Sequence, residues 1–284
     1  MCKQVSSVTA LLIWLFLATV AGLAETGGGD LSPYIRYDSN IGQLDTSIVT
    51  MRNARGQEID LIAAVHVASP AYYSTLNKKF KSYDAVLYEL ILPDEMAGQR
   101  LPEQLETGSG VAGMQAMIAQ AMGLTTQMAK VNYSPANFVH ADLTQSGLSQ
   151  KMTERQENLM SYMMKALAAS DTSGANLGVT DQELAELDFM AIMSGRTSAK
   201  DRKILKKLLG STLASSGGLL SALGDSALIA ERNKAAIKVA ERETQAGKRR
   251  MAIFYGAAHM PDLRKRLTDA GWKATGTDWV KAWD

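Results

Sequence analysis

The chain has 284 residues, and its 30 Lys and Arg almost balance its 29 Asp and Glu. This balance excludes the strongly basic surface with which proteins bind nucleic acid, so we expect no nucleic-acid partner. Its 46% apolar content and six prolines indicate an ordered globular protein. The length suits one large α/β domain or a smaller one with an insertion.

An apolar segment spans residues 8–24. One cation, Lys3, precedes it, and the small residues Gly22 and Ala24 fit an export cleavage site. Residues 1–24 are therefore predicted to be a signal peptide, and the mature protein to be periplasmic or secreted. The apolar run also reaches the short limit for a membrane span. The alternative is an uncleaved anchor that holds the protein at a membrane.

The mature chain opens with two strand-like segments, residues 46–53 and 58–67, joined by the hairpin connection 54–57. The next segment, 69–81, begins with a serine cap and a first-turn proline and predicts a helix. Residues 84–92 then form an apolar run that is typical of a buried strand. Strand, helix and strand at this spacing predict a βαβ unit with parallel strands.

The composition changes between residues 102 and about 225, where Ala, Met, Leu, Gln and Ser prevail with helical periodicity. We expect a large helical insertion with helices at 110–130, 149–168, 181–193, 199–209 and 213–223, and a short extended piece at 137–144. Its methionines would either fill a helical core, the interpretation that we favour, or line a groove for a peptide or lipid.

The second half of the sheet is predicted from residue 226 onwards. A long helix at 226–246 leads into an apolar strand, which breaks at Gly256. His259 follows, and Pro261 opens another helix. His259 is therefore expected in the turn between a buried strand and a helix, where open α/β sheets collect their ligands.

Together these elements predict an α/β fold, with a mixed sheet built from two strand–helix halves and the helical insertion between them. Residues 25–284 would form this single domain. A closing segment, 272–280, would add one or two edge strands.

Two of the three histidines occupy matching places in the two halves. His66 follows an apolar strand and precedes the helix that Pro70 opens, just as His259 precedes Pro261. Two imidazoles at neighbouring strand ends suit a divalent metal ion or an acid–base pair. Either histidine alone would be read as structural, but the pair favours a functional site.

Glu89 and Arg232 are the charged candidates for the same site. Glu89 lies in the apolar run VLYELIL, where an ionised carboxylate is costly unless it is paired or metal-bound. It would complete a site of two histidines and one carboxylate, or it would pair with a cation on the sheet surface. Arg232 lies on the inward face of its helix, so it should meet Glu89, a substrate carboxylate or a developing oxyanion, or hold a carboxylate as a structural cation.

His140 and Asp142 are weaker candidates within the insertion. One of them could reach over the site as a ligand, a substrate contact or a lid residue. The alternative is that they cap a helix or satisfy local backbone groups. We place both, together with Gly256, on the substrate side of the site.

These residues resemble the motifs of the TraB/PrgY/GumN family, whose superfamily includes Tiki proteases and erythromycin esterase-like and ChaN-like proteins. The family carries two Gly-x-x-His motifs, an acidic residue after the first and an arginine before the second. Residues 256–259, Gly-Ala-Ala-His, match the second motif, and Glu89 and Arg232 match the acidic and basic positions. The first motif departs from the pattern, because Ala63 replaces the glycine ahead of His66.

The resemblance covers most of the mature chain and is closest from Glu231 to the end. It implies an α/β core with the site between two strand–helix units. In its Tiki branch it also implies metal-dependent peptide hydrolysis, whereas other branches bind pheromone peptides or haem iron. The family therefore defines fold and site better than activity.

The resulting hypothesis is a metal-dependent hydrolase of the cell envelope that acts on a peptide bond. His66, His259 and Glu89 would bind Mn²⁺, Co²⁺ or Zn²⁺, and Glu89 and Arg232 would act in catalysis on a peptide or small-molecule substrate. One alternative is a binding protein that sequesters a peptide or small ligand in the same crevice without cleaving it. Another is a metal-free hydrolase in which a histidine is the general base.

Overall fold

The computed structural model describes residues 31–103, 105, 111–158, 160–162, 178–215 and 225–284. The predicted signal peptide, residues 1–24, lies outside the described residues. Among the helices that are described, none is both long enough and apolar enough to cross a membrane.

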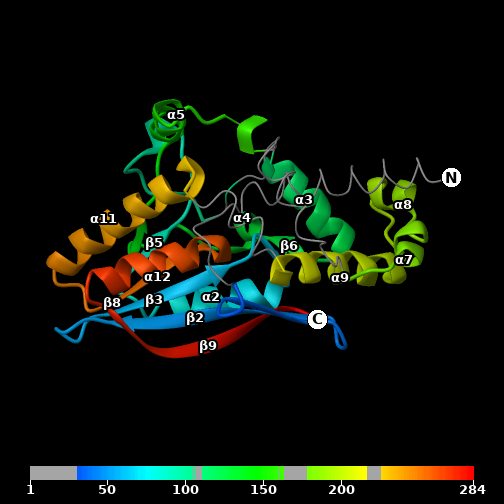
Figure 1. The fold of residues 1–284 in the computed structure, drawn as a ribbon, viewed down its shortest axis with the longest axis horizontal. Helices are drawn as coiled ribbons and strands as arrows, with labels where there is room; N and C mark the ends of the chain where they lie inside the picture. Colours follow the sequence, from blue (N-terminus) through cyan, green and yellow to red (C-terminus); the bar gives the residue numbers. More distant parts are fainter. Residues whose placement is uncertain (1–30, 104, 106–110, 159, 163–177, 216–224) are drawn as a thin grey trace.

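The described residues form a seven-stranded mixed sheet at the centre of the molecule (Figure 1). Its strands are β1 (Ile35–Asp38), β2 (Gln43–Arg52), β3 (Glu58–Ala64), β5 (Ala85–Tyr88), β7 (Phe138–His140), β8 (Arg250–Gly256) and β9 (Lys273–Trp283). The order is β1–β2–β3–β8–β5–β7, with β9 paired to β2. The strands β3, β8, β5 and β7 run parallel, and β1, β2 and β9 add antiparallel pairs. The predicted α/β class with a mixed sheet is confirmed.

The predicted hairpin is the pair β2 and β3, with Arg52 opposite Glu58. Its turn contains Gly56 at a φ of +75°, a conformation that glycine adopts without steric cost. The strand β3 then leads into helix α2 (Pro70–Phe80), where the Ser69 hydroxyl accepts a hydrogen bond from the Tyr72 backbone at 3.3 Å. Both the hairpin and the capped helix agree with the sequence pattern.

Helix α2 connects β3 to β5, and β8 lies between these two strands. The βαβ unit is therefore present, with the strand of the second half inserted into it. The strand β5 ends at Tyr88, four residues earlier than predicted. Glu89 consequently lies just beyond a strand end rather than inside a strand.

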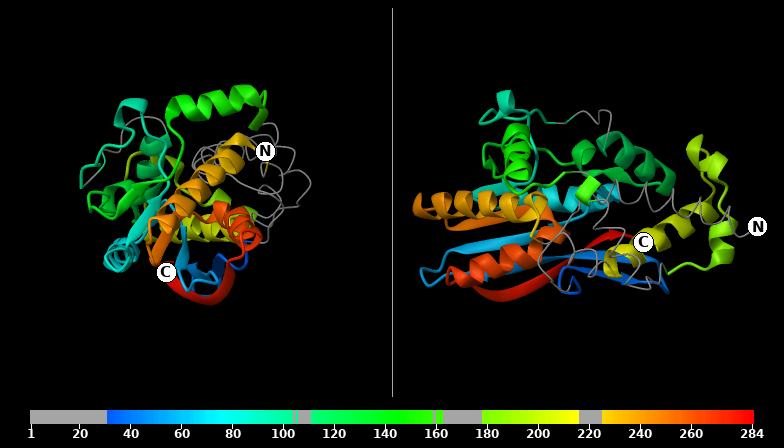
Figure 2. Two further views of the ribbon diagram at one scale, coloured as in Figure 1. Left: turned by 90° about the vertical axis from the view of Figure 1, so that its left-hand side faces the viewer. Right: turned by 45° about the horizontal axis from the view of Figure 1, so that its top comes forward.

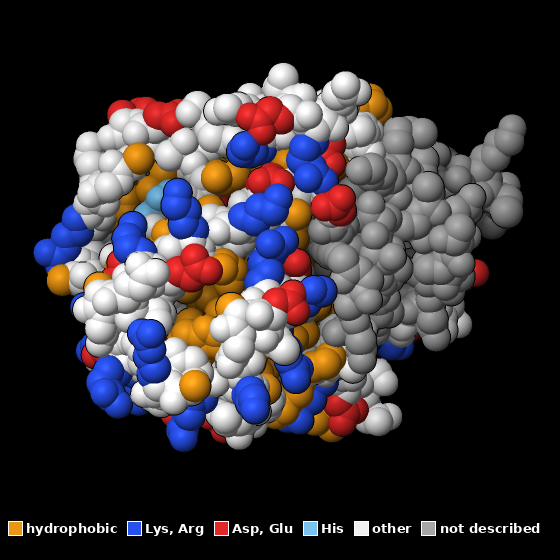
Figure 3. Space-filling view, turned by 60° about the vertical axis from the view of Figure 1, so that its left-hand side comes forward, with side chains coloured by type: hydrophobic (Ala, Val, Ile, Leu, Met, Phe, Trp, Pro, Cys, Tyr) orange, Lys and Arg blue, Asp and Glu red, His pale blue; other side chains and the backbone are white. Residues whose placement is uncertain are grey.

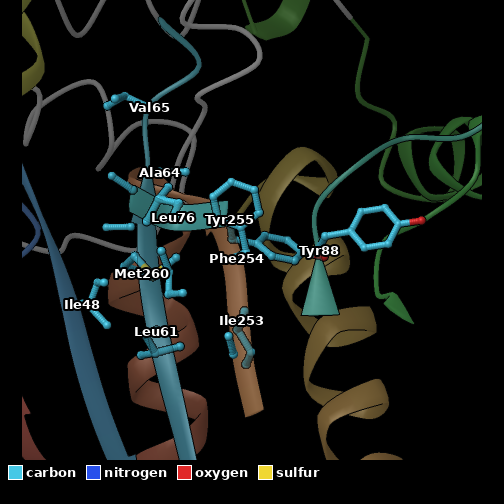
Figure 4. Packing of buried hydrophobic residues seen from close by; sticks show 14 of the residues in the cluster. Ile48, Leu61, Ala64, Val65, Leu76, Tyr88, Ile253, Phe254, Tyr255 and Met260 are labelled. Carbon is cyan, nitrogen blue, oxygen red and sulfur yellow. The ribbon is translucent and has the colours of Figure 1, made fainter. Parts of the chain in front are cut away.

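Helices cover both faces of the parallel strands (Figures 1 and 2). On one face lie α11 (Arg232–Gln245) and α12 (Met260–Asp269), and on the other lies α2. A π-helical turn, Ala227–Glu231, leads into α11. Between the layers, Leu61, Ile253 and Phe254 are fully buried (Figure 4).

A 3₁₀ turn, η1 (Asp94–Met96), precedes the insertion. The insertion contributes α3 (Val111–Met122), β6 (Thr125–Thr126), α4 (Gln127–Lys130), α5 (Gln145–Glu154), α7 (Asp181–Ala185), α8 (Phe189–Met193) and α9 (Ala199–Ser215). The short strand β4 (Val67–Ala68) pairs with β6. Helices α3, α7, α8 and α9 lie at the end of the molecule towards which the parallel strands run (Figure 1).

Several predicted helix boundaries were wrong. The helix expected at 110–130 breaks at Gly123, which has a φ of +67°. The helix expected at 181–193 is two helices, because the Asp188 side chain accepts from the Ala191 backbone and starts a new one. The break expected after residue 209 is absent, since α9 runs without interruption to Ser215.

Other predictions for the insertion also change. The piece at 137–144 supplies β7, which pairs in parallel with β5, so the insertion adds a strand to the main sheet. Helix α5 begins at Gln145, earlier than the predicted start at 149. Parts of the helices expected at 149–168 and 213–223 lie outside the described residues. The methionines are divided, with Met122 in the core and Met160 and Met190 exposed.

The surface shown in Figure 3 carries Lys and Arg side chains interspersed with Asp and Glu, around patches of apolar surface. This mixture agrees with the near-balance of charge in the sequence.

Candidate functional site

Four predicted site residues lie just after the carboxyl ends of parallel strands. His66 follows β3, Glu89 follows β5, Asp142 follows β7 and His259 follows β8. Because parallel strands end at the same edge of a sheet, all four lie along one edge. That edge is where open α/β sheets bind their ligands.

Glu89 is buried, with 6% of the residue exposed. Its Oε2 accepts a hydrogen bond from the Gly256 backbone N–H at 2.6 Å, and its Oε1 accepts one from Arg232 Nη2 at 2.7 Å. Burial alone would raise the pKa of Glu89, but the charges of Arg232, His259 and, less strongly, His66 hold this pKa well below its usual value. Glu89 is therefore an ionised carboxylate in a fixed orientation.

Arg232 binds a second carboxylate as well. Its Nε and Nη2 donate to the two carboxylate oxygens of Asp142 at 2.9 and 2.6 Å, and its Nη1 donates to the Leu228 carbonyl at 3.4 Å. Burial lowers the pKa of Arg232, but Asp142 and Glu89 raise it further, so the guanidinium stays charged. The π-helical turn directly before Arg232 is a feature that often marks functional positions.

His259 lies in a single 3₁₀ turn, Ala257–His259, between β8 and α12, and no part of it is exposed. Its Nδ1 lies 2.6 Å from Asn233 Oδ1. The Asn233 amide is oriented by Asp262, whose Oδ2 accepts from Asn233 Nδ2 at 2.8 Å and from Arg266 Nε at 2.6 Å. Because Asn233 Oδ1 can only accept, Nδ1 of His259 carries a proton, and Nε2 is the ring nitrogen left to take a second proton or to bind a ligand.

That Nε2 atom is buried and has no hydrogen-bond partner among the described residues. It lies 3.4 Å from Glu89 Oε1, without the alignment of a hydrogen bond, and the contact is ionic only when the ring is protonated. Glu89 and Asp142 place two negative charges beside the single positive charge of Arg232. A proton or a metal cation at Nε2 would balance this cluster.

His66 differs from His259 in its surroundings. It is half-buried, and its carbonyl accepts from the Gln127 backbone N–H at 2.8 Å. The sheet register pairs Ala64, not Ala63, with Gly256, so the two motifs are offset by one residue across the sheet. After His66 the chain continues into β4, whereas after His259 it turns directly into a helix.

The charge of His66 contributes to the low pKa of Glu89, but His66 does not complete a three-ligand group. Within the part of the chain that the structure describes, no three His, Cys, Asp or Glu side chains are arranged to hold a metal ion. The structure thus brings Glu89, His259, Arg232 and Asp142 together and leaves His66 at the border of the cluster.

The other residues predicted for the site are His140, Asp142 and Gly256. The His140 Nε2 atom donates to the Leu90 carbonyl at 2.7 Å, and its ring lies 5.6 Å from the ring of Tyr88. Asp142 lies within the charge cluster rather than over it, since Arg232 occupies both of its oxygens. Gly256 contributes its backbone N–H to Glu89.

Sequence reasoning missed Asn233, Asp262 and Tyr255. The Tyr255 hydroxyl donates to the Ala141 carbonyl at 2.5 Å, and its ring lies 5.2 Å from the ring of His259. Asn233 is fully buried directly after Arg232, and Asp262 lies three residues after His259. A polar residue next to an inward arginine, and an acid in the first turn after the histidine, were the available signals.

No family model, curated protein or solved structure matches the chain.

Proposed function

We propose that this protein is a metal-dependent hydrolase of the TraB/PrgY/GumN type that acts on a peptide bond. The observation that carries the proposal is the buried Nε2 of His259, which lacks a hydrogen-bond partner and lies 3.4 Å from Glu89 Oε1. A buried polar atom without a partner is rare in native proteins and calls for a ligand or a proton.

The geometry of this pair suits a metal ion. Two donor atoms that each lie ~2.1 Å from a tetrahedral ion are ~3.4 Å apart, which matches the separation of His259 Nε2 and Glu89 Oε1. The lone pair on Nε2 and the ionised carboxylate are also the right donor types for Mn²⁺, Co²⁺ or Zn²⁺. We propose His66, at the border of the cluster, as the third ligand; since it does not form a three-ligand group with His259 and Glu89 in this structure, it would have to move towards the ion on binding.

When bound, the ion would lower the pKa of a coordinated water and polarise the scissile carbonyl. The chain itself provides the positioning. The Gly256 N–H and Arg232 hold the Glu89 carboxylate, and Asn233 holds the His259 ring. Arg232 has its donors occupied by Asp142, Glu89 and a backbone carbonyl, so we assign it as a positioning residue rather than a substrate contact.

One observation favours the alternative of a sequestering protein. The hydrogen bonds among Glu89, Asp142 and Arg232 are complete without any substrate. Such a cluster also suits a rigid wall of a binding crevice. In the metal-free alternative, His259 would be a general base that Asn233 orients.

Incubation with a peptide library derived from a proteome separates these functions. We expect new peptide termini, detected by mass spectrometry, in the presence of Mn²⁺, Co²⁺ or Zn²⁺, and loss of cleavage with a strong chelator. His259→Ala should abolish cleavage, and folding of the variant is checked by circular dichroism. Complete recovery of every peptide would support sequestration, and cleavage that survives chelation would support the metal-free mechanism.

The envelope location is proposed from residues 8–24. Amino-terminal sequencing of the protein from a cell fraction tests it. A mature terminus just after Ala24 is expected, while an intact Met1 in the membrane fraction would indicate an anchor.

A further inference from the structure

Gln127, at the start of helix α4, is a buried amide whose hydrogen bonds are incomplete. Only 5% of the residue is exposed. Its Nε2 donates to the Tyr133 hydroxyl at 2.9 Å, whereas its Oε1 is buried and has no hydrogen-bond partner among the described residues. A buried acceptor without a donor is unfavourable, so Gln127 Oε1 calls for a group that donates to it.

The strand register places Gln127 beside His66. The antiparallel strands β4 and β6 pair Val67 with Thr126. One residue further along the same register, His66 lies opposite Gln127, and the Gln127 backbone N–H donates to the His66 carbonyl at 2.8 Å. Side chains of directly opposed residues in an antiparallel pair project on the same side, with Cβ atoms about 5 Å apart. The Gln127 side chain and the His66 imidazole are therefore neighbours.

The second histidine of the candidate site is held by an amide in the same way. His259 Nδ1 lies 2.6 Å from Asn233 Oδ1, so a buried amide oxygen orients this ring. A histidine that binds a metal ion through one ring nitrogen commonly donates its other ring N–H to a carbonyl or carboxylate oxygen. Asn233 supplies such an oxygen to His259, and Gln127 has one to supply beside His66.

We infer that Gln127 is a positioning residue for His66, and that its Oε1 accepts the ring N–H of His66 when the other ring nitrogen turns towards a metal ion. The inference rests on the proposed function, because it concerns the third ligand of that site. A rotation about the His66 side-chain torsions is compatible with the backbone hydrogen bond to Gln127, which stays in place. The Tyr133 hydroxyl holds the nitrogen end of the amide and leaves its oxygen for His66.

Calorimetric titration of the full chain with Mn²⁺, Co²⁺ and Zn²⁺ in turn tests this role, and the tightest-binding ion is then used for the variants. Gln127→Met keeps the length of the side chain but removes the acceptor, so affinity should fall about 10- to 100-fold with one ion still bound. Gln127→Glu keeps an acceptor oxygen and should stay within about threefold of the wild type. If Gln127→Met does not fold, Gln127→Leu takes its place with the same expected loss.

Gln57→Met is the matched control. Gln57 is a similarly buried glutamine, and it donates to the Thr244 and Lys248 carbonyls at the amino end of β3, whereas His66 follows the carboxyl end. The substitution should lower the melting temperature but leave the metal affinity unchanged. Melting curves of all variants check that they are folded.

A double-mutant cycle separates positioning from a general effect on the fold. His66→Ala removes the ring on which Gln127 acts, so adding Gln127→Met to this variant should change the affinity by less than about twofold. Equal losses with and without the His66 ring would overturn the inference. Wild-type affinity in Gln127→Met would also overturn it and would leave an ordered water molecule as the partner of Oε1.

The two proposals fail in different ways. A wild type that binds none of the three ions refutes the metal-dependent function, and the role of Gln127 with it. Ion binding that depends on His259 but not on Gln127 refutes the inference and leaves the proposed function in place. Ion binding that is unchanged in His66→Ala refutes both the third ligand and the inference, and leaves His259 and Glu89 as ligands.

Discussion

Glu89 illustrates how one buried carboxylate can be both costly and useful. Its burial removes the carboxylate from water, which is unfavourable, but the Gly256 N–H and Arg232 donate hydrogen bonds to its two oxygens. Arg232 also binds Asp142. Removal of one member of a buried ion pair leaves its partners uncompensated. Substitutions in this cluster should therefore change the free energy of unfolding as well as the affinity for a metal ion.

Glu89→Gln should lower the free energy of unfolding by about 3 kcal/mol at neutral pH, because Arg232 loses a charged partner. Since the folded pKa of Glu89 lies below its unfolded value of about 4.3, its stabilising contribution is fully present above that pH and is lost as the pH falls through the folded pKa. The stability difference between wild type and Glu89→Gln should thus shrink on acidification. Urea denaturation at a series of pH values measures it, and a difference independent of pH would contradict the ionised state of Glu89.

Asn233→Ala tests the orientation of His259. The ring would lose the acceptor for Nδ1, so metal affinity should fall about 10- to 100-fold while the stoichiometry is kept. Asp262→Asn retains an acceptor for the Asn233 amide and should have a smaller effect. Calorimetric titration gives both affinities, and melting curves check the fold. Wild-type affinity in Asn233→Ala would assign this contact to structure alone.

At the scale of elements, the sequence predicted correctly those turns, caps and strands that depend only on neighbouring residues. The hairpin before Glu58, the Ser69 cap of α2 and the apolar strand before Gly256 follow from turn chemistry and apolar runs. The helix breaks in the insertion were not predicted, because the sequence around them has helical periodicity. The breaks come from the left-handed conformation of Gly123 and from the cap that Asp188 provides. Helix α9 continues through Gly210, which packs against Tyr37 of β1, a tertiary contact that no local pattern contains.

Gly210 of α9 packs against Tyr37 of β1. A Cβ at Gly210 would lie 2.4 Å from the ring of Tyr37. Gly210→Ala should therefore destabilise the protein by about 1–3 kcal/mol through overpacking, even though alanine favours the helix. In a Tyr37→Ala background the same change should become stabilising. Gly276→Ala meets no atom within 4 Å and serves as the control in denaturant unfolding. A Gly210→Ala effect of the same sign in both backgrounds would contradict this packing.

At the scale of the whole molecule, the two halves of the chain interlock. The strand β8 of the second half lies between β3 and β5 of the first, and β9 returns to pair with β2. The sequence predicted that His66 and His259 lie at strand ends, which placed them at one edge, but it placed Glu89 inside a strand. It did not predict the strand order, the offset between the two motifs or the partnership of Asp142 with Arg232, because these depend on which strands become neighbours and in what register.

Trp283 tests the closing strand. Its side chain is almost completely buried at the end of β9, and its Nε1 has no hydrogen-bond partner among the described residues. Trp283→Ala should cost about 3–5 kcal/mol of unfolding free energy. Trp283→Phe should cost less, because it keeps an aromatic ring and removes an unsatisfied donor. Equal losses for the two variants in urea denaturation would contradict a purely apolar role.

The measurement that tests the central claim most directly is the metal content of the purified protein after equilibration with Mn²⁺, Co²⁺ or Zn²⁺ in turn. The account predicts about one bound ion per chain for the wild type and for His140→Ala. It predicts loss of that ion in His259→Ala and Glu89→Gln, with folding checked by circular dichroism. A wild-type protein without bound metal, or a His259→Ala variant that keeps it, would contradict the assignment of His259 and Glu89 as ligands.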